Sequence, residues 1–188
     1  MNMILLRVLA VIFYNCYPDS ELPQMVKDCL KSHEILQERC VLLDSLPPEC
    51  AAVYDEELRK IRKATSTEVI LTDLDGDKTM EMVILSGGTG SGGSDWTVMQ
   101  KKNGKYCKVG DVFGTLYKNG KGLIVKHGCG WENAGWTYYE LRNGKLQKLL
   151  SVDVTYGASK NPQYPKVVKM EIKDELKDNT KVFVSNND

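Results

Sequence analysis

The sequence predicts an α+β fold, in which an N-terminal helical hairpin is followed by an antiparallel β meander. Two observations carry this prediction. Apolar residues recur at helical spacing in the first third of the chain, and after Thr67 they alternate in short runs separated by turn residues. At 188 residues the chain is long enough for one well-buried core. We therefore divide it into an N-terminal segment (residues 1–17), a helical hairpin (18–66) and an antiparallel β domain (67–188).

Residues 1–17 carry the features of a short secretory signal. Arg7 precedes the apolar run Val8–Tyr14, which is too short to span a bilayer. No small-residue cleavage site follows, so a buried N-terminal helix or strand is the alternative. Six cysteines, an even number without C-x-x-C spacing, suit an oxidising compartment. We expect a secreted or periplasmic protein with no transmembrane span, and a cytoplasmic location is the alternative.

Two helices are predicted between residues 20 and 63. Apolar residues recur at helical spacing from Leu22 to Leu43, and Pro47 follows as a stop signal. Pro48 fits the first turn of a second helix, because the N–H that proline lacks is not needed there. The short connection predicts an antiparallel pair of helices packed on or beside the β domain.

The β domain is predicted from repeated hairpin signals. An Asn-Gly pair between alternating apolar runs favours a type I′ turn, because both residues tolerate a positive φ. Such pairs occur at Asn103-Gly104, Asn119-Gly120 and Asn143-Gly144. Short strands joined by short turns make an antiparallel meander. The predicted strands are 68–72, 80–85, 96–100, 106–109, 112–118, 123–126, 136–141 and 146–152, with 166–173 and 181–184 as possible edge strands.

An acidic loop separates the first two of these strands. It reads Asp73-Leu-Asp75-Gly-Asp77-Lys-Thr79-Met-Glu81, with carboxylates at its first, third, fifth and ninth positions. This spacing lets a tight loop wrap several oxygen ligands around a hard cation such as calcium. Carboxylates this close repel one another, and a bound cation would offset that cost. The alternative is an Asp-Gly turn that is acidic but binds no metal.

The loop resembles the D-x-D-G-D-G-x-x-E/D calcium loop of FG-GAP and VCBS repeats, found in integrin-type extracellular β-propellers. The resemblance covers Val69 to Ser86 and departs at Lys78, where those repeats have a glycine. It implies that the meander resembles propeller-type blades, although a single loop is too few to close a propeller. It also implies calcium as cofactor, bound by the side chains of Asp73, Asp75, Asp77 and Glu81 and by the carbonyl of Thr79.

A glycine-rich stretch, Ser86–Ser94, follows the second strand. It contains the pattern Gly88-x-Gly90-x-x-Gly93, which also occurs in dinucleotide-binding loops. A phosphate site needs a helix N-terminus next, but Asp95–Gln100 predicts a strand. We expect a solvated loop, which could border a binding surface.

Aromatic and polar residues concentrate between His127 and Glu140. Trp and Tyr combine a large contact area with a polar group, which suits recognition. The predicted recognition surface comprises Trp131, Glu132, Trp136 and Tyr138, and core packing of these aromatic rings is the alternative. Nothing in the surrounding sequence indicates an activated Cys129 thiolate, so no catalytic residue is assigned.

Charge and composition limit the function. Lys+Arg and Asp+Glu both number 25, so the net charge predicts no binding to nucleic acid or to an anionic membrane. The sequence predicts a non-enzymatic, exported protein that binds a protein or glycan partner. One alternative is a hydrolase of glycan or cell-wall material that uses carboxylates such as Asp95, Glu132 or Glu140. The other is an intracellular immunity or inhibitor protein.

Overall fold

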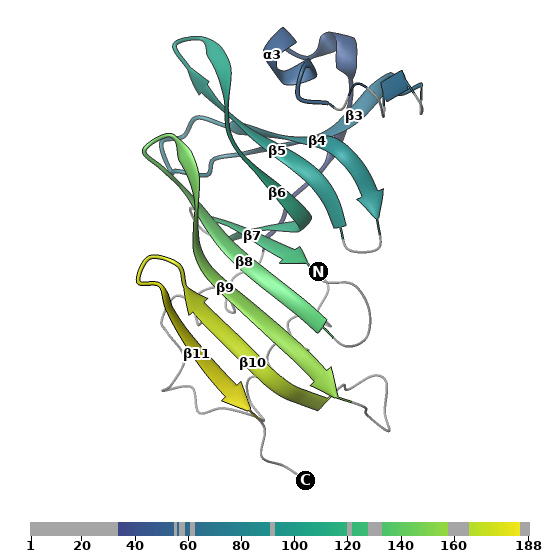
Figure 1. Cartoon of the computed structure of the whole chain (residues 1–188). Coiled ribbons are helices and arrows are strands. Elements are labelled where there is room, and N and C mark those ends of the chain that lie inside the picture. Colours follow the sequence, from purple (N-terminus) through teal and green to yellow (C-terminus); the bar gives the residue numbers. More distant parts are fainter. Residues whose placement is uncertain are drawn as a thin grey trace.

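The computed structural model describes residues 34–54, 56, 59–60, 63–90, 93–119, 122–127, 133–157 and 166–184. Within this part of the chain the architecture is almost entirely antiparallel β-sheet (Figure 1). The predicted signal segment and the first part of the predicted helical hairpin lie outside the described residues. None of the helices in the described part is long and apolar enough to cross a membrane.

The described residues form eleven strands in one hydrogen-bonded network. The 3-10 helix η2 (Leu43–Ser45) and the α-helix α3 (Pro48–Ala51) lie between the second and third strands, where Glu56, Arg59 and Lys60 are also helical. The strands are β1 (Glu34–Ile35), β2 (Arg39–Leu42), β3 (Ser66–Thr72), β4 (Glu81–Gly90), β5 (Gly93–Lys102), β6 (Lys105–Asn119), β7 (Gly122–His127), β8 (Asn133–Arg142), β9 (Lys145–Gly157), β10 (Lys166–Asp174) and β11 (Asn179–Val184).

Strands β2 to β11 lie side by side in chain order, and each pairs antiparallel with the next. This is a meander, as predicted for the C-terminal part of the chain. The strand β1 lies off this path and pairs with the end of β6. Because hydrogen bonding runs unbroken from β2 to β11, the described strands do not divide into separate propeller-type blades, and that part of the predicted fold class is wrong.

Strand β6 joins two groups of strands. Its residues up to Gly114 pair with β5, whereas Thr115–Asn119 pair with β7. Gly114 has a φ of +147°, and the Lys126 carbonyl lies so close that a Cβ at this position would clash. Only glycine fits here, and the bend lets one strand of 15 residues replace the two strands predicted for 106–118.

Strands β3, β4 and β5, in the upper part of Figure 1, are covered on both faces. Side chains such as Ile70, Val83 and Val98 point to one face and pack with residues of β6, β7 and β8. Their neighbours point to the opposite face, which η2 and α3 cover. This alternation is what a strand with two buried faces requires. The second face comprises Leu43, Leu46, Cys50, Tyr54, Val69, Met82, Ile84 and Met99.

The predicted helical hairpin is wrong, because a strand replaces the described end of its first helix, although Glu56, Arg59 and Lys60 of its second helix are helical. Residues 39–42 form β2, which pairs with β3 in the register Arg39↔Val69. The second helix begins at Pro48 as predicted, but α3 has only four residues. Leu43 and Leu46 bury their side chains against the sheet, not against a partner helix. Strand pairing with β3 therefore overrides the helical spacing of the apolar residues.

The glycine-rich stretch is not a loop, contrary to the prediction. Strand β4 continues to Gly90 and β5 begins at Gly93, with Thr89 paired to Ser94. A bulge lies between Leu85 and Thr89. A Cβ on Gly87 would lie 2.7 Å from the Asp95 carboxylate, so the absent side chain allows this close approach.

Two of the predicted Asn-Gly turns have the expected backbone. Asn103 and Gly104 have φ values of +51° and +81°, and Asn143 and Gly144 have +52° and +70°. Positive φ at both positions is the signature of the type I′ turn, so these two predictions are confirmed. The third turn includes Gly120, which lies outside the described residues.

Candidate metal site

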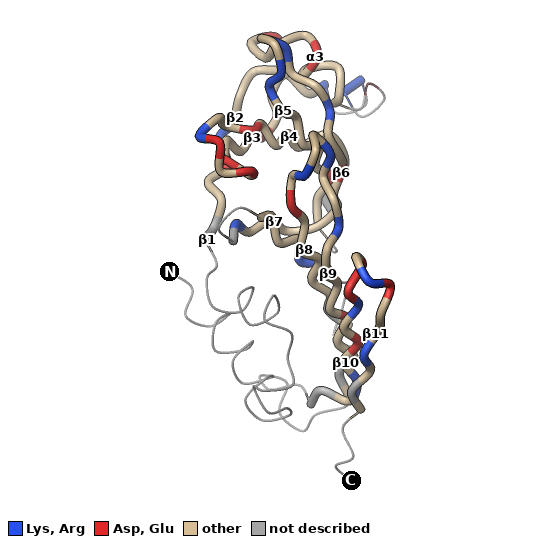
Figure 2. The backbone as a smooth tube through the Cα atoms, turned by 90° about the vertical axis from the view of Figure 1, so that its left-hand side faces the viewer, with Lys and Arg blue, Asp and Glu red and all other residues tan. Residues whose placement is uncertain are grey.

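The acidic loop connects the end of β3 to the start of β4, at the side of the sheet where these strands end. Thr72 and Glu81 face each other as the last pair of the two strands, and residues 73–80 form the loop between them. Figure 2 shows its acidic segments in red beside β2 and β3. The loop therefore closes a β-turn-β corner, and its two ends are held by strand pairing.

The loop is wound around its own carboxylates. Asp73 accepts two backbone hydrogen bonds, and Asp75 and Asp77 accept one each. Such Asx turns hold short acidic loops in a fixed shape. The four bonds run from Gly76 N to Asp73 Oδ1 (2.7 Å), Lys78 N to Asp73 Oδ2 (3.1 Å), Asp77 N to Asp75 Oδ1 (3.1 Å) and Thr79 N to Asp77 Oδ1 (2.6 Å).

Lys78 occupies the position at which the calcium loops of FG-GAP and VCBS repeats have glycine. Its φ is +70°, and that of Gly76 is +80°. A left-handed conformation costs a residue with a Cβ about 1–2 kcal/mol. Lys78 adopts this conformation nevertheless, so the sharp turn forms without the glycine.

Glu81 is the unusual group of the site. Its side chain is 0% exposed; Oε2 accepts the Leu74 N–H at 2.6 Å, but Oε1 is buried without any hydrogen-bond partner. Burial raises the pKa of Glu81 to about 7, against the Leu74 hydrogen bond and with help from the nearby aspartates. A buried carboxylate oxygen without a partner is costly, and a cation in the loop would supply the missing partner.

The structure brings together three of the predicted ligands. One oxygen from each of Asp73, Asp75 and Glu81 lies within 4.8 Å of the other two. Calcium binds oxygen at 2.3–2.6 Å, so two oxygens on one ion lie at most about 5 Å apart. The triad therefore fits around a single ion. Asp77 and Thr79 are exposed, and their roles as ligands stay predictions.

A further residue, which lies on β5 and was not predicted from the sequence, contacts the loop. Gln100 on β5 donates from Nε2 to Asp75 Oδ2 at 3.0 Å, and its Oε1 is buried without a partner. Gln100 lies 25 residues from Asp75 in the sequence, so only the pairing of β4 with β5 reveals the contact. It fixes the orientation of one ligand and ties β5 to the loop.

The charge of Lys118 also acts on the loop. Burial raises the pKa of Asp73, but the hydrogen bonds from the Gly76 and Lys78 N–H groups and the charge of Lys118 lower it by more. Asp73 therefore stays ionised at neutral pH. The end of β6, which carries Lys118, thus lies near the acidic loop.

The predicted recognition surface is only partly described. Trp131 and Glu132 lie outside the described residues, and Trp136 and Tyr138 are half-buried on β8. The Tyr138 ring packs on Gly122 of β7, and its hydroxyl donates to Glu140 Oε1 at 2.8 Å. Tyr138 thus packs between strands, and a recognition role for these residues stays a prediction.

The other candidate residues have ordinary environments. Glu140 forms an ion pair with Arg142 at 2.7 Å, and Asp95 is exposed. Among the thiols, Cys50 is buried, and burial raises its pKa to about 11, so it is a poor nucleophile. Cys129 lies outside the described residues, while Cys107 is a free, exposed thiol.

Comparison with known proteins identifies no family for the chain. No family model matches it, and no curated protein is similar to it. A solved structure described as a "Xanthomonas Type IV Secretion System related protein" has 23% sequence identity and a TM-score of 0.47. The match covers 63% of this chain and 58% of that one. At this level of similarity it carries no conclusion about fold or function.

Proposed function

We propose that the chain is an exported, calcium-stabilised β-sheet protein that acts by binding a protein or glycan partner. The observation that supports the cation site most strongly is the Glu81 carboxylate. It is fully buried, one of its oxygens has no partner, and Asp73 and Asp75 lie close to it. A buried negative charge beside two others is stabilised only by a proton or a cation.

The donor set favours calcium over other metals. The three converging ligands are carboxylates, which offer hard oxygen atoms to a metal. The neighbouring Gln100 adds a side-chain amide, and none of these described residues is a histidine or cysteine. Zinc and copper prefer histidine and cysteine, whereas oxygen ligands suit calcium and magnesium. The half of the loop that includes Asp77 is exposed and leaves room for water, as the larger coordination number of calcium requires.

The cation would act on structure. Asp73 and Asp75 follow β3, Glu81 begins β4, and Gln100 of β5 holds Asp75. One ion would therefore link the ends of three neighbouring strands. The resemblance to FG-GAP and VCBS loops supports the same role, since in those repeats the metal ties one strand to the next.

The experiment is a calcium titration of the purified full chain by calorimetry and by thermal unfolding, after removal of metal with a chelator. Calcium should raise the melting temperature, because mass action adds about 2.7 kcal/mol at a hundred times Kd. Magnesium should have a smaller effect, since it accepts irregular oxygen geometry poorly. An unchanged melting curve in calcium would contradict the proposal.

Two variants and one control make the experiment specific. Asp75→Ala should abolish the calcium-induced rise, because it removes one of the three converging ligands. Glu81→Gln should do the same while keeping the side-chain shape. The control is Asp178→Ala, an exposed aspartate in the β10–β11 turn, which should leave the calcium response unchanged.

A further inference from the structure

The fold gathers lysines around the acidic loop, although the chain as a whole has no net charge. Gln100 bonds to Asp75 of the loop, and two residues further along β5 the Lys102 ammonium packs against Gly144 in the β8–β9 turn. Lys118, at the end of β6, acts electrostatically on Asp73. The acidic loop, the β5–β6 turn, the β8–β9 turn and the end of β6 are therefore neighbours on one edge of the sheet. We call this edge the turn edge.

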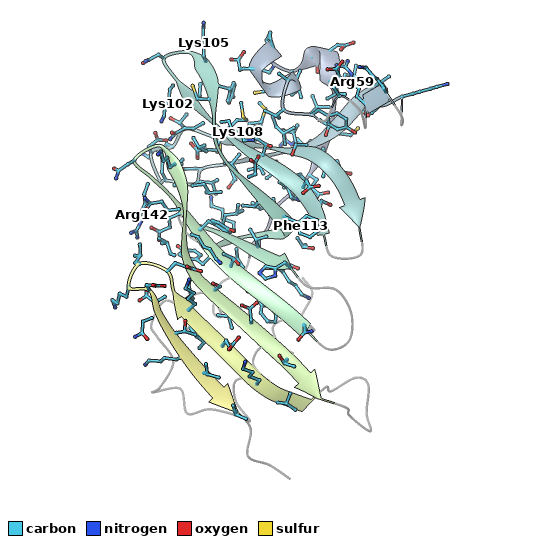
Figure 3. The ribbon with its side chains drawn as sticks, viewed as in Figure 1. Arg59, Lys102, Lys105, Lys108, Phe113 and Arg142 are labelled. Carbon is cyan, nitrogen blue, oxygen red and sulfur yellow. The ribbon has the colours of Figure 1, made fainter. Side chains whose placement is uncertain are left out.

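The lysines of the turn edge come from a repeated sequence pattern. Each Asn-Gly turn is flanked by cationic residues, as in Lys102-Asn-Gly-Lys105 and Arg142-Asn-Gly-Lys145. Lys102, Lys105 and Lys145 are exposed, and none of them forms an ion pair within the described part of the chain. Figure 3 shows Lys102, Lys105 and Arg142 together on this side of the molecule, far from Arg59. Figure 2, which views this side, shows blue segments on both sides of the red loop.

The acidic loop decides the charge of the turn edge. Without metal, its four carboxylates, together with Glu49 beside Lys105, balance the charge of Lys78, Lys102, Lys105, Lys118 and Lys145. A divalent cation in the loop neutralises two of these negative charges, and the edge becomes clearly positive. Attraction to an anionic surface then depends on occupancy of the metal site.

We propose that the turn edge docks on a negatively charged phospholipid surface when calcium occupies the acidic loop. This inference rests on the proposed cation site. Lys102, Lys105 and Lys145 flank the Asn-Gly turns at the ends of their strands and are exposed, so their charges are accessible to a surface. An exposed apolar side chain of the loop, Met80 (52% exposed), can enter the headgroup region. Lysines near an anionic leaflet each contribute to such binding.

The test is sedimentation of the full chain with phosphatidylglycerol–phosphatidylcholine vesicles at about 0.1 M salt, a concentration at which exposed charges still interact over about 10 Å. In the presence of calcium the protein should co-sediment with these vesicles. A chelator or 0.5 M salt should release it, and pure phosphatidylcholine vesicles should not bind it. The variant Lys102→Gln with Lys145→Gln should bind about 25-fold more weakly, from about fivefold per lysine.

Matched controls separate this inference from the cation site itself. Lys60→Gln with Lys63→Gln removes the same charge near Arg59, away from the turn edge, and should bind vesicles like the unaltered chain. Calorimetry should show that the Lys102/Lys145 variant still binds calcium, whereas Glu81→Gln should lose both calcium and vesicle binding.

The outcomes that overturn docking are equally distinct. Calcium binding without vesicle binding, or equal loss in both lysine variants, rules out the turn edge as a lipid surface and leaves the cation site intact. Binding to soluble dextran sulfate but not to vesicles rules out a lipid surface in favour of a free polyanion. If calorimetry detects no calcium binding, the proposed function fails, and the docking inference fails with it.

Discussion

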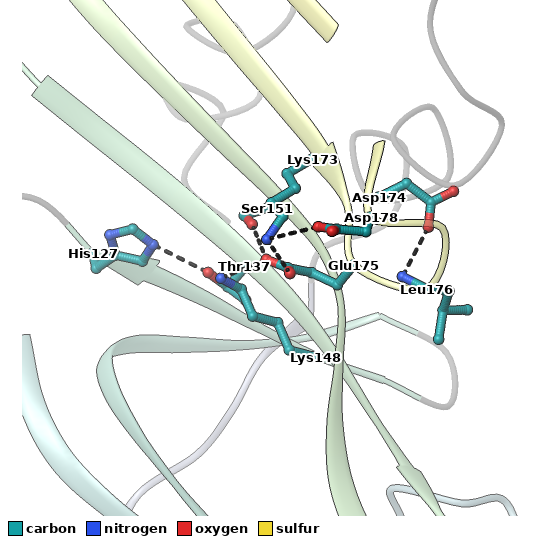
Figure 4. A network of polar contacts seen from close by, with 9 residues as sticks. All are labelled: His127, Thr137, Lys148, Ser151, Lys173, Asp174, Glu175, Leu176 and Asp178. Carbon is teal, nitrogen blue, oxygen red and sulfur yellow. Dashed lines mark hydrogen bonds and ion pairs between the residues drawn. The ribbon is translucent and has the colours of Figure 1, made fainter. Parts of the chain in front are cut away.

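Two glutamates at turns of the same sheet have opposite surroundings. Glu175, in the β10–β11 turn, accepts Lys148 at 2.8 Å, Lys173 at 3.0 Å and the Ser151 hydroxyl at 2.8 Å (Figure 4). The Lys148 hydrogen bond, with those of Lys173 and Ser151 and against burial, lowers the pKa of Glu175 to about 2. Glu81 has only the Leu74 N–H, and burial raises its pKa to about 7.

The difference shows where each counter-charge comes from. Around Glu175 the chain supplies two lysines, so the carboxylate is satisfied without any ligand. Around Glu81 the nearest charged groups are other carboxylates, so the missing positive charge has to come from solvent. An acidic turn thus indicates a cation site when no lysine or arginine of the chain pairs with its buried carboxylate.

The largest expected effect is the pH dependence of metal-free stability. The folded pKa of Glu81, about 7, lies above the unfolded value of 4.5, so the folded state binds the proton more tightly. The free energy of unfolding should therefore fall as pH rises from about 4.5 to 7, by roughly 3 kcal/mol. Urea unfolding in chelator between pH 5 and about 8 measures this fall. Glu81→Gln should flatten the curve, and parallel curves for the two proteins would contradict the role given to Glu81.

Glu175 should show the opposite sign and a smaller effect. Its folded pKa of about 2 lies below the unfolded 4.5, so its stabilisation is complete above about pH 4.5 and is lost as pH falls toward 2. Glu175→Gln should lower the free energy of unfolding at pH 7 by about 1–2 kcal/mol, because partly exposed ion pairs are weak. The same urea titrations, repeated at pH 7 and near pH 2, should show the loss at pH 7 only. Calcium should not change it.

The smallest expected effect compares the backbones of the two turns. Lys78 and Asp178 both have positive φ, at +70° and +47°. Lys78→Gly should stabilise the fold by about 0.5–1 kcal/mol, since glycine removes the strain but adds unfolded-state entropy. Asp178→Gly should gain less, because aspartate tolerates this conformation better than lysine. Thermal unfolding in chelator measures both changes, and an equal gain at the two positions would remove the backbone contrast between the turns.

Features set by nearby residues could be predicted from the sequence. The Asn103-Gly104 and Asn143-Gly144 turns depend on two adjacent residues that tolerate positive φ. The acidic loop forms through hydrogen bonds between residues at most five positions apart. In each case the determining contacts lie within the segment itself.

Features set by distant contacts could not be predicted. Strand β2 is mostly exposed and shows no alternation, so only its pairing with β3 makes it a strand. The helical spacing of Leu36 and Leu43 instead reflects residues that lie on either side of β2 and pack against the two faces of the sheet. Gln100 joins the acidic loop because β5 lies beside β4, and the orphan oxygen of Glu81 depends on burial by the whole core. These facts require knowledge of the strand order.

The pairing of β1 with β6 has a consequence for how the chain folds. Neighbours along the path from β2 to β11 are also neighbours in sequence, so these strands can assemble hairpin by hairpin with little loop-closure entropy. The register Glu34↔Lys118 is different, because it joins a strand that precedes β2 in the sequence to β6, in the middle of that path. We expect β1 to dock late, after the second half of β6 has formed, and to be the first of the described strands to detach when the protein is destabilised.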